Sequence, residues 1–147
     1  MKILHLPFRS TLEAYQAQAV QLLQARNVGD ADAIRMFREH HPRFLDEKIP
    51  WLPKKMTEAE VHDIPLDLSD ARLAIARWHC FLDWAALTQY VDAVTRDDSP
   101  ICRFESAVES LITGDAEGLK RWLHADPLLI RARSSRITPH DPPQHRA

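Results

Sequence analysis

Apolar residues recur every three or four positions along most of the chain, a spacing that predicts amphipathic helices. The pattern covers residues 10–41, 69–95 and 99–131, and a turn divides each segment into two runs. We therefore expect an all-α fold of stacked antiparallel helix–turn–helix pairs, with almost no strand. The positions expected to face the core are Leu12, Tyr15, Ala19, Leu22, Leu23, Ile34, Phe37, Ala71, Ala74, Ile75, Trp78, Trp84, Leu87, Val91, Val94, Ile101, Phe104, Val108, Leu111, Ile112, Leu119, Trp122 and Leu123.

A short stretch of the first pair returns in the third. Residues 29–37 (GDADAIRMF) are echoed by residues 114–122 (GDAEGLKRW), and Pro42 and Pro127 follow at the same spacing. Glycine suits the left-handed residue that ends a helix, and the aspartate after it is a natural cap for the next helix. A helix–turn–helix unit that recurs in this way is typical of α-helical repeat proteins.

Other helix starts are marked by capping residues. Ser10 with Glu13 reads as a capping box, in which each side chain accepts a hydrogen bond from the backbone of the other. Asp83 is the expected cap of the helix that follows it. Ser99 precedes a proline at the first helical position, and Asp126 does the same, which is a strong start signal.

Residues 42–68 break the helical pattern, and prolines interrupt them repeatedly. Thr57 and Glu60 predict a capping box at one short helical turn. The segment is too apolar for a disordered linker. We interpret it as a long connector between the first and second pairs that Trp51 packs against the core.

One domain is expected over residues 10–133, because a chain of 147 residues is long enough for one domain with a buried core. An irregular lead-in, residues 1–9, precedes it. Residues 134–147 are rich in proline and have no buried pattern, so we expect a flexible tail there.

The composition excludes several classes of protein. The net charge of −2 gives neither a basic footprint for nucleic acid nor a polybasic membrane anchor, and no apolar run is long enough to span a membrane. Only three glycines are present, so glycine-rich phosphate loops are absent. Cys80 and Cys102 are too few for a four-cysteine zinc site, and without a signal peptide we expect reduced thiols. These observations favour a cytoplasmic protein.

Part of the chain resembles a known family. The segments 103–115 and 119–134, with their Gly-Asp turn, buried aromatic residue and Asp-Pro step, are similar to the N-terminal helical region of bacterial ankyrin-repeat proteins. Residues 74–87 share the likeness. The ankyrin signature Thr-Pro-Leu-His is absent, and Thr138-Pro139-His140 matches it only weakly. The resemblance implies a capping region that precedes the signature repeats, from a fragment of a longer protein or a truncated gene product.

Histidines and cysteines suggest chemistry at three places, and each has a plainer structural interpretation. His40 and His41, with Asp46 and Glu47, contain metal-ligand types, but adjacent histidines do not share a helix face, so we expect a surface helix end. His79 and Cys80 are neighbours in a turn, where a structural cysteine is more common than a nucleophile. The third group lies in the expected tail and comprises His140, Asp141 and His145.

Partner-binding candidates come from exposed aromatic and basic residues. Trp51 lies between prolines in the irregular connector and is the tryptophan most suited to a contact role, whereas Trp78, Trp84 and Trp122 have helical spacing and belong to the core. A basic stretch formed by Arg131, Arg133 and Arg136 suits an acidic partner or, in the plainer interpretation, a solvated tail.

No catalytic, metal or cofactor-binding set assembles from these patterns. We expect a non-catalytic protein–protein interaction scaffold, or the capping module of a helical repeat protein, whose partner is another protein or further repeats of its own chain. One alternative is a helix-turn-helix nucleic-acid binder built on residues 69–95, although its second helix carries Asp83 and Asp92 and no Lys or Arg. A second alternative is an enzyme that uses the scattered histidines.

Overall fold

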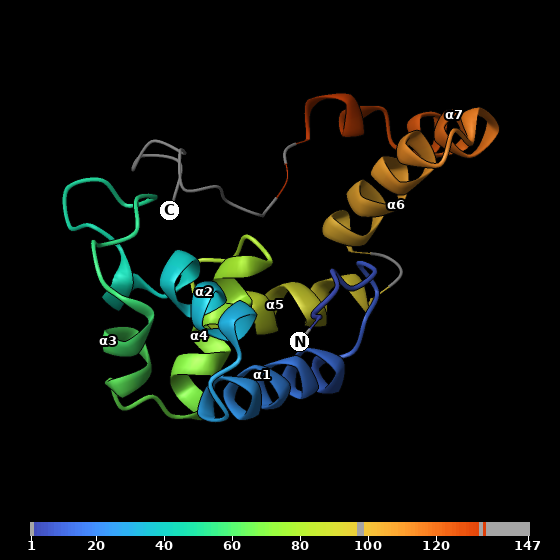
Figure 1. Cartoon of the computed structure of the whole chain (residues 1–147). Coiled ribbons are helices and arrows are strands. Elements are labelled where there is room, and N and C mark those ends of the chain that lie inside the picture. Colours follow the sequence, from blue (N-terminus) through green and yellow to red (C-terminus); the bar gives the residue numbers. More distant parts are fainter. Residues whose placement is uncertain (1, 97–98, 133, 135–147) are drawn as a thin grey trace.

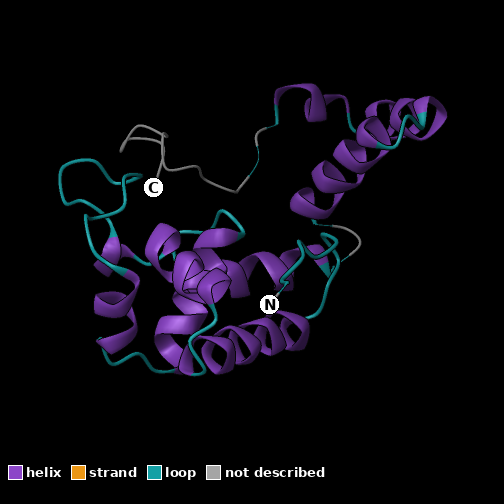
Figure 2. Ribbon diagram, in the orientation of Figure 1, coloured by secondary structure: helices purple, strands orange, loops and turns teal. Residues whose placement is uncertain are grey.

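The all-α prediction is confirmed by the computed structural model, which describes residues 2–96, 99–132 and 134 (Figures 1 and 2). Within these residues there is no strand, and one isolated antiparallel bridge joins Leu45 and Pro53. The elements in order are α1 (Leu12–Asn27), α2 (Ala31–His40), the 3-10 helix η1 (Pro42–Phe44), α3 (Glu58–Asp63), α4 (Leu68–Trp78), α5 (Trp84–Val94), α6 (Pro100–Ile112), α7 (Ala116–Ala125) and the 3-10 helix η2 (Pro127–Arg131).

Helix α4 is central to the body of the molecule and packs against α1, α2 and α5 (Figure 1). Its inner positions Ala71, Ala74 and Ile75 are fully buried. The two alanines are small, so α1 and α2 can approach α4 closely, with Leu22 and Phe37 packed in the same cluster. Short helix α3 covers α2 from outside.

A second cluster of buried residues joins α1 to α5 and is covered by the N-terminal segment. Tyr15, Phe81 and Leu87 belong to it, and Leu6 and Phe8 pack against it. The expected lead-in therefore contributes to the core. The Gln18 side chain of α1 also donates a hydrogen bond to the Leu4 carbonyl at 2.7 Å, which fixes the segment on this helix.

Helices α6 and α7 form a pair that extends away from the body (Figure 1). The prediction that Leu111 and Ile112 face the core is wrong, since they are 66% and 74% exposed. The buried side of α6 is instead formed by Cys102, Glu105, Ala107 and Ser110. The elements that pack most closely on α6 are α5, α7 and η2, and they leave Leu111 and Ile112 at its C-terminal end exposed.

Three helices end in the same left-handed turn. The second residue after the helix has φ of 80° at Gly29, 75° at Gly114 and 68° at Cys80. The amide after each of them bonds to a carbonyl five residues earlier, as in the 2.9 Å bond from Phe81 to Ala76, which is the Schellman arrangement. The two glycine turns confirm the prediction. Cys80 forms a third turn of this kind, which its residue type does not indicate.

Most predicted caps are confirmed, and one is shifted. Asp30, Asp83, Ser99 and Asp126 each accept a backbone N–H bond at the start of the next helix. The capping box expected at residues 57–60 is also present. At α1 the cap is Thr11, not Ser10, because the Thr11 hydroxyl accepts from the Ala14 amide.

We predict that Cys80→Gly makes the protein more stable than Cys80→Ala by about 1 kcal/mol. A Cβ atom is strained at φ of 68°, and both variants remove the same thiol. The measurement is the free energy of unfolding from urea titrations. Gly114→Ala is the converse test and should destabilise by a similar amount. Equal stability of the two Cys80 variants would show that this turn is unstrained.

Candidate functional site

The candidate site is the connector loop, residues 44–54, which protrudes from the body between η1 and α3 (Figure 1). Its foot is firmly seated: Phe44 is fully buried and Leu45 is 8% exposed. The Lys54 amide donates to the Phe44 carbonyl at 2.8 Å, beside the bridge between Leu45 and Pro53. The two arms of the loop are thus joined where they leave the core.

The tip of the loop, residues 46–52, is also held by hydrogen bonds. The Asp46 carboxylate accepts from the amides of Lys48 (2.8 Å) and Ile49 (3.0 Å). The Asp46 amide donates to the Leu52 carbonyl at 2.8 Å, and the Leu52 amide donates to the Ile49 carbonyl at 3.0 Å. Residues 49–52 form a four-residue turn, and Pro50 at its second position restricts the backbone further. The tip therefore has a defined shape.

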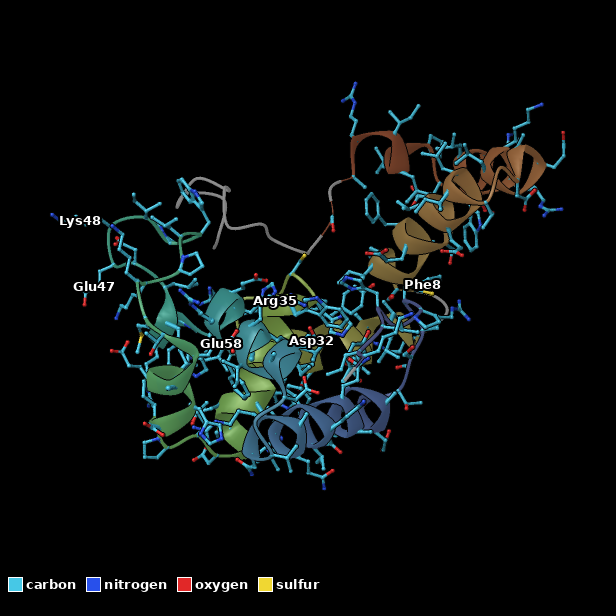
Figure 3. All side chains as sticks on the ribbon, viewed as in Figure 1. Phe8, Asp32, Arg35, Glu47, Lys48 and Glu58 are labelled. Carbon is cyan, nitrogen blue, oxygen red and sulfur yellow. The ribbon has the colours of Figure 1, made fainter. Side chains whose placement is uncertain are left out.

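Apolar side chains are exposed at this tip. Ile49, Trp51 and Leu52 are 39%, 50% and 47% exposed. Figure 3 shows Glu47 and Lys48 at the outer edge of the loop. The prediction that Trp51 packs the connector against the core is wrong, because Phe44 and the fully buried Val61 do so. The exposed position agrees with a contact role for Trp51, which stays a prediction.

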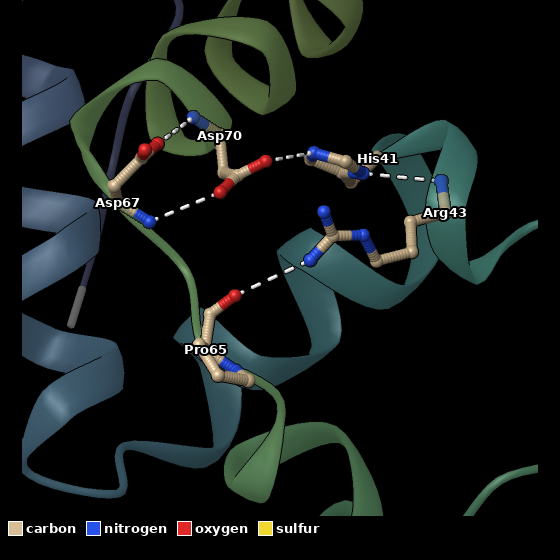
Figure 4. Close-up of polar contacts among 5 residues, drawn as sticks. All are labelled: His41, Arg43, Pro65, Asp67 and Asp70. Atoms are coloured by element: carbon tan, nitrogen blue, oxygen red, sulfur yellow. Dashed lines mark hydrogen bonds and ion pairs between the residues drawn. The ribbon is translucent and has the colours of Figure 1, made fainter.

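His41 holds the foot of the loop from inside the protein. It is 5% exposed, so the expected surface position is wrong for this residue. Its Nδ1 accepts the Arg43 backbone N–H at 3.1 Å and thereby caps η1. Because an amide only donates, the ring proton is on Nε2, which donates to the Asp70 carboxylate at 2.9 Å (Figure 4). The second Asp70 oxygen accepts the Asp67 amide at 3.0 Å.

The electrostatics of this pair favour a neutral imidazole beside a carboxylate. Burial lowers the pKa of His41 and outweighs the opposite effect of Asp70. Burial acts to raise the pKa of Asp70, but its hydrogen bonds with the Asp67 amide and with His41 hold it below the ordinary value. The unfolded chain, with a histidine pKa near 6.5, therefore binds more protons. Stability from His41 is present above about pH 6.5 and lost as the pH falls.

The far end of the connector is fixed by two arginines. Arg26 of α1 is 7% exposed, and its Nη2 donates to the carbonyls of His62 and Ile64, where α3 ends. Arg43 donates to the Pro65 carbonyl at 3.2 Å (Figure 4). Sequence patterns give no signal for these contacts, because an arginine within an amphipathic helix is ordinarily a surface residue.

The other sequence candidates do not gather at this loop. Arg131 is exposed at the end of η2, which Figure 1 places beside α6 and away from the loop. Arg133 and Arg136 lie outside the described residues, as do His140, Asp141 and His145. In the part of the chain that the structure describes, no three His, Cys, Asp or Glu side chains are placed to hold a metal ion.

His79 and Cys80 are neighbours with separate structural roles. The buried His79 ring bonds through Nε2 to the Gln18 side-chain oxygen at 2.8 Å and lies edge-on to Tyr15. Gln18 in turn holds the Leu4 carbonyl. The histidine thus links α1, the end of α4 and the N-terminal segment. Cys80 serves the turn described above.

Together these features define an all-α protein with an ordered, apolar-tipped loop. No protein-family model, no curated protein and no solved structure matches the chain. Across residues 2–96, 99–132 and 134, none of the helices has the length and apolar character needed to cross a membrane.

We predict that Arg26→Met lowers the free energy of unfolding by about 2 kcal/mol, because it leaves two carbonyls of the connector without their donor. Arg35→Met is the matched control. Arg35 is 64% exposed and pairs with Asp32 on the surface, so its loss should change stability by about 0.5 kcal/mol or less. Urea denaturation measures both. If Arg26→Met and Arg35→Met lower the free energy of unfolding equally, the hydrogen bonds of Arg26 do not stabilise the connector.

Proposed function

We propose that this protein is a non-catalytic interaction module that presents the connector loop to a protein partner. The observation that carries the proposal is the exposed run Ile49 to Leu52 on a tip whose backbone is closed by hydrogen bonds. Trp51 is the proposed anchor, because tryptophan is enriched among the residues that dominate binding energy.

The order of the loop supports a binding role. Ile49, Trp51 and Leu52 belong to one four-residue turn, so a single concave surface can enclose all three. A loop that is already ordered loses little conformational entropy on binding. Glu47 and Lys48 supply a charged rim of both signs, which suits a specific partner better than a nonspecific one.

The alternatives gain less support. Helix α5, the candidate recognition helix, buries Leu87, Tyr90, Val91 and Val94, and so has little surface left to enter a groove. Asp92 adds a negative charge on the remaining face. An enzyme that uses scattered histidines finds no support in the contacts of His41 and His79, which serve α4, η1 and the N-terminal segment.

A capping role in a helical repeat protein is a second candidate, and the exposed apolar residues of the last described pair favour it. Leu111, Ile112, Leu128 and Ile130 are between 66% and 77% exposed. Further repeats packed on α6, α7 and η2 would cover such residues. The sequence resemblance to the N-terminal region of bacterial ankyrin-repeat proteins adds to this proposal.

We predict that Trp51→Ser weakens partner binding at least about 30-fold, the effect of losing an anchor worth 2 kcal/mol. Wild-type and variant proteins are used as baits in extracts of the source cells, and captured proteins are quantified by mass spectrometry. The direct partner is then titrated in purified form. Folding should be unaffected, because Trp51 is half exposed.

Val28→Ser is the matched control for that experiment. Val28 is 84% exposed at the end of α1, so the substitution removes apolar surface away from the loop. The Val28→Ser variant should therefore capture the same partner as the wild-type protein. If no captured protein distinguishes Trp51→Ser from Val28→Ser, the loop is not the binding surface.

The capping role predicts that a consensus ankyrin repeat fused after Ser134 raises the free energy of unfolding by about 3 kcal/mol, because it buries exposed apolar side chains. Ile112→Glu should remove the gain. The same repeat fused ahead of Lys2 is the control and should add nothing. Equal effects of the two fusions would contradict stacking on the last pair.

A further inference from the structure

We propose that His41 is an acid-sensitive lock on the connector loop, so that protonation of its Nδ1 atom releases η1 and the loop that follows. The link to partner release rests on the proposed function; the lock itself is a property of this chain alone. The lock depends on the position of the His41 ring, which lies between a hydrogen-bond donor and a hydrogen-bond acceptor.

Only one protonation state of the ring, with a proton on Nε2 alone, satisfies both of its hydrogen-bonding neighbours. Nδ1 faces the Arg43 amide, a donor, while Nε2 faces the Asp70 carboxylate, an acceptor (Figure 4). A proton added to Nδ1 sets two N–H groups against each other at the 3.1 Å contact. The cap of η1 is then lost, although the bond between Nε2 and Asp70 is kept.

The ring has no room to turn away from this conflict. It is 5% exposed and lies against Phe37 and Phe44, with ring centroids 6.4 and 5.7 Å away. Phe44 is both a neighbour of the ring and the foot of the loop. Movement of η1 away from the ring therefore displaces the residue on which the loop is seated.

The charged groups around the ring set the pH range. Asp70 and Arg77 of α4 and Arg43 of η1 are the charged groups near the ring. Helix α2 faces the ring with the uncharged Phe37. The two arginines and burial oppose protonation, and Asp70 favours it. The pKa of Asp70 is held low, so this carboxylate stays ionised while the histidine titrates. Because the pKa of Asp70 is also lowered, His41 is the group of this pair that gains a proton first as the pH falls.

The hydrogen bonds of the loop are connected in series from this cap. Phe44 and Leu45 donate to carbonyls of residues 41 and 42, and Lys54 donates back to Phe44. Once η1 opens, the joint between the two arms opens with it. The tip then loses its fixed position on the body, on which partner binding is proposed to depend.

Hydrogen exchange read by mass spectrometry tests the lock in the full chain without any partner. Rates at neutral pH and at about pH 5 are corrected for the intrinsic pH dependence of exchange. We expect amides of residues 43–54 to exchange at least about tenfold faster in acid, and those of α5 to stay protected. Nitrogen-15 spectra of the imidazole should show the proton on Nε2 at neutral pH, and His41 should titrate in step with the Arg43 amide.

Two variants separate His41 from its neighbour. His41→Asn places an amide oxygen near the former Nδ1 position and cannot titrate, so its loop exchange should not depend on pH beyond the intrinsic effect. His40→Asn leaves the lock in place and should keep the wild-type response. If His41→Asn fails to fold, the wild-type nitrogen-15 titration alone decides.

The proposal is overturned if His41 gains its proton while residues 43–54 stay protected, or if His41→Asn keeps the acid response. Partner binding is measured separately at the same two pH values. Binding that needs Trp51 but ignores pH would refute the lock and leave the proposed function standing. A pH-dependent loop in a protein without a Trp51-dependent partner would refute the proposed function and leave the lock standing.

Discussion

The fold depends on holding together the two ends of a long connector. Helices α2 and α4 are neighbours in the core, yet residues 41–67 separate them along the chain, and closing such a loop costs entropy. The bond between His41 and Asp70 joins the start of the connector directly to α4, and Arg26 ties α1 to the end of α3. Because these donors are buried, breaking either bond leaves a polar group without a partner in a medium of low dielectric constant.

Signals carried by a few neighbouring residues were enough to predict much of the helical structure. A glycine followed by an aspartate predicted the turns at residues 29 and 114, because both the left-handed backbone and the cap depend on local chemistry. Helical spacing likewise predicted the buried positions of α1, α2, α4 and α5. The burial of Leu111 and Ile112 was predicted wrongly, because periodicity shows that a helix has an apolar face and not whether another element covers it.

The candidate site could be predicted only in part, since it combines exposure with buried polar contacts. Trp51 was singled out because it lies among prolines, and the structure places it at an ordered tip. His41 was assigned to the surface because its partner Asp70 is 29 residues away, a distance at which sequence pattern carries no information. Cys80 was placed in a turn, but its left-handed conformation was not predicted, because nothing in its residue type indicates one.

A small free energy at the foot of the loop is enough to matter at its tip. When only a fraction of molecules holds the binding conformation, the apparent affinity falls by that fraction. A tenfold weakening needs about 1.4 kcal/mol, which is the typical net contribution of one hydrogen bond. Loss of the one bond from the Arg43 amide to His41 is therefore enough to shift the loop without unfolding the helices beneath it. If Phe44 alone seated the loop, the stability of the loop would not depend on pH, because phenylalanine does not titrate. The buried His41 makes the stability of the loop depend on pH.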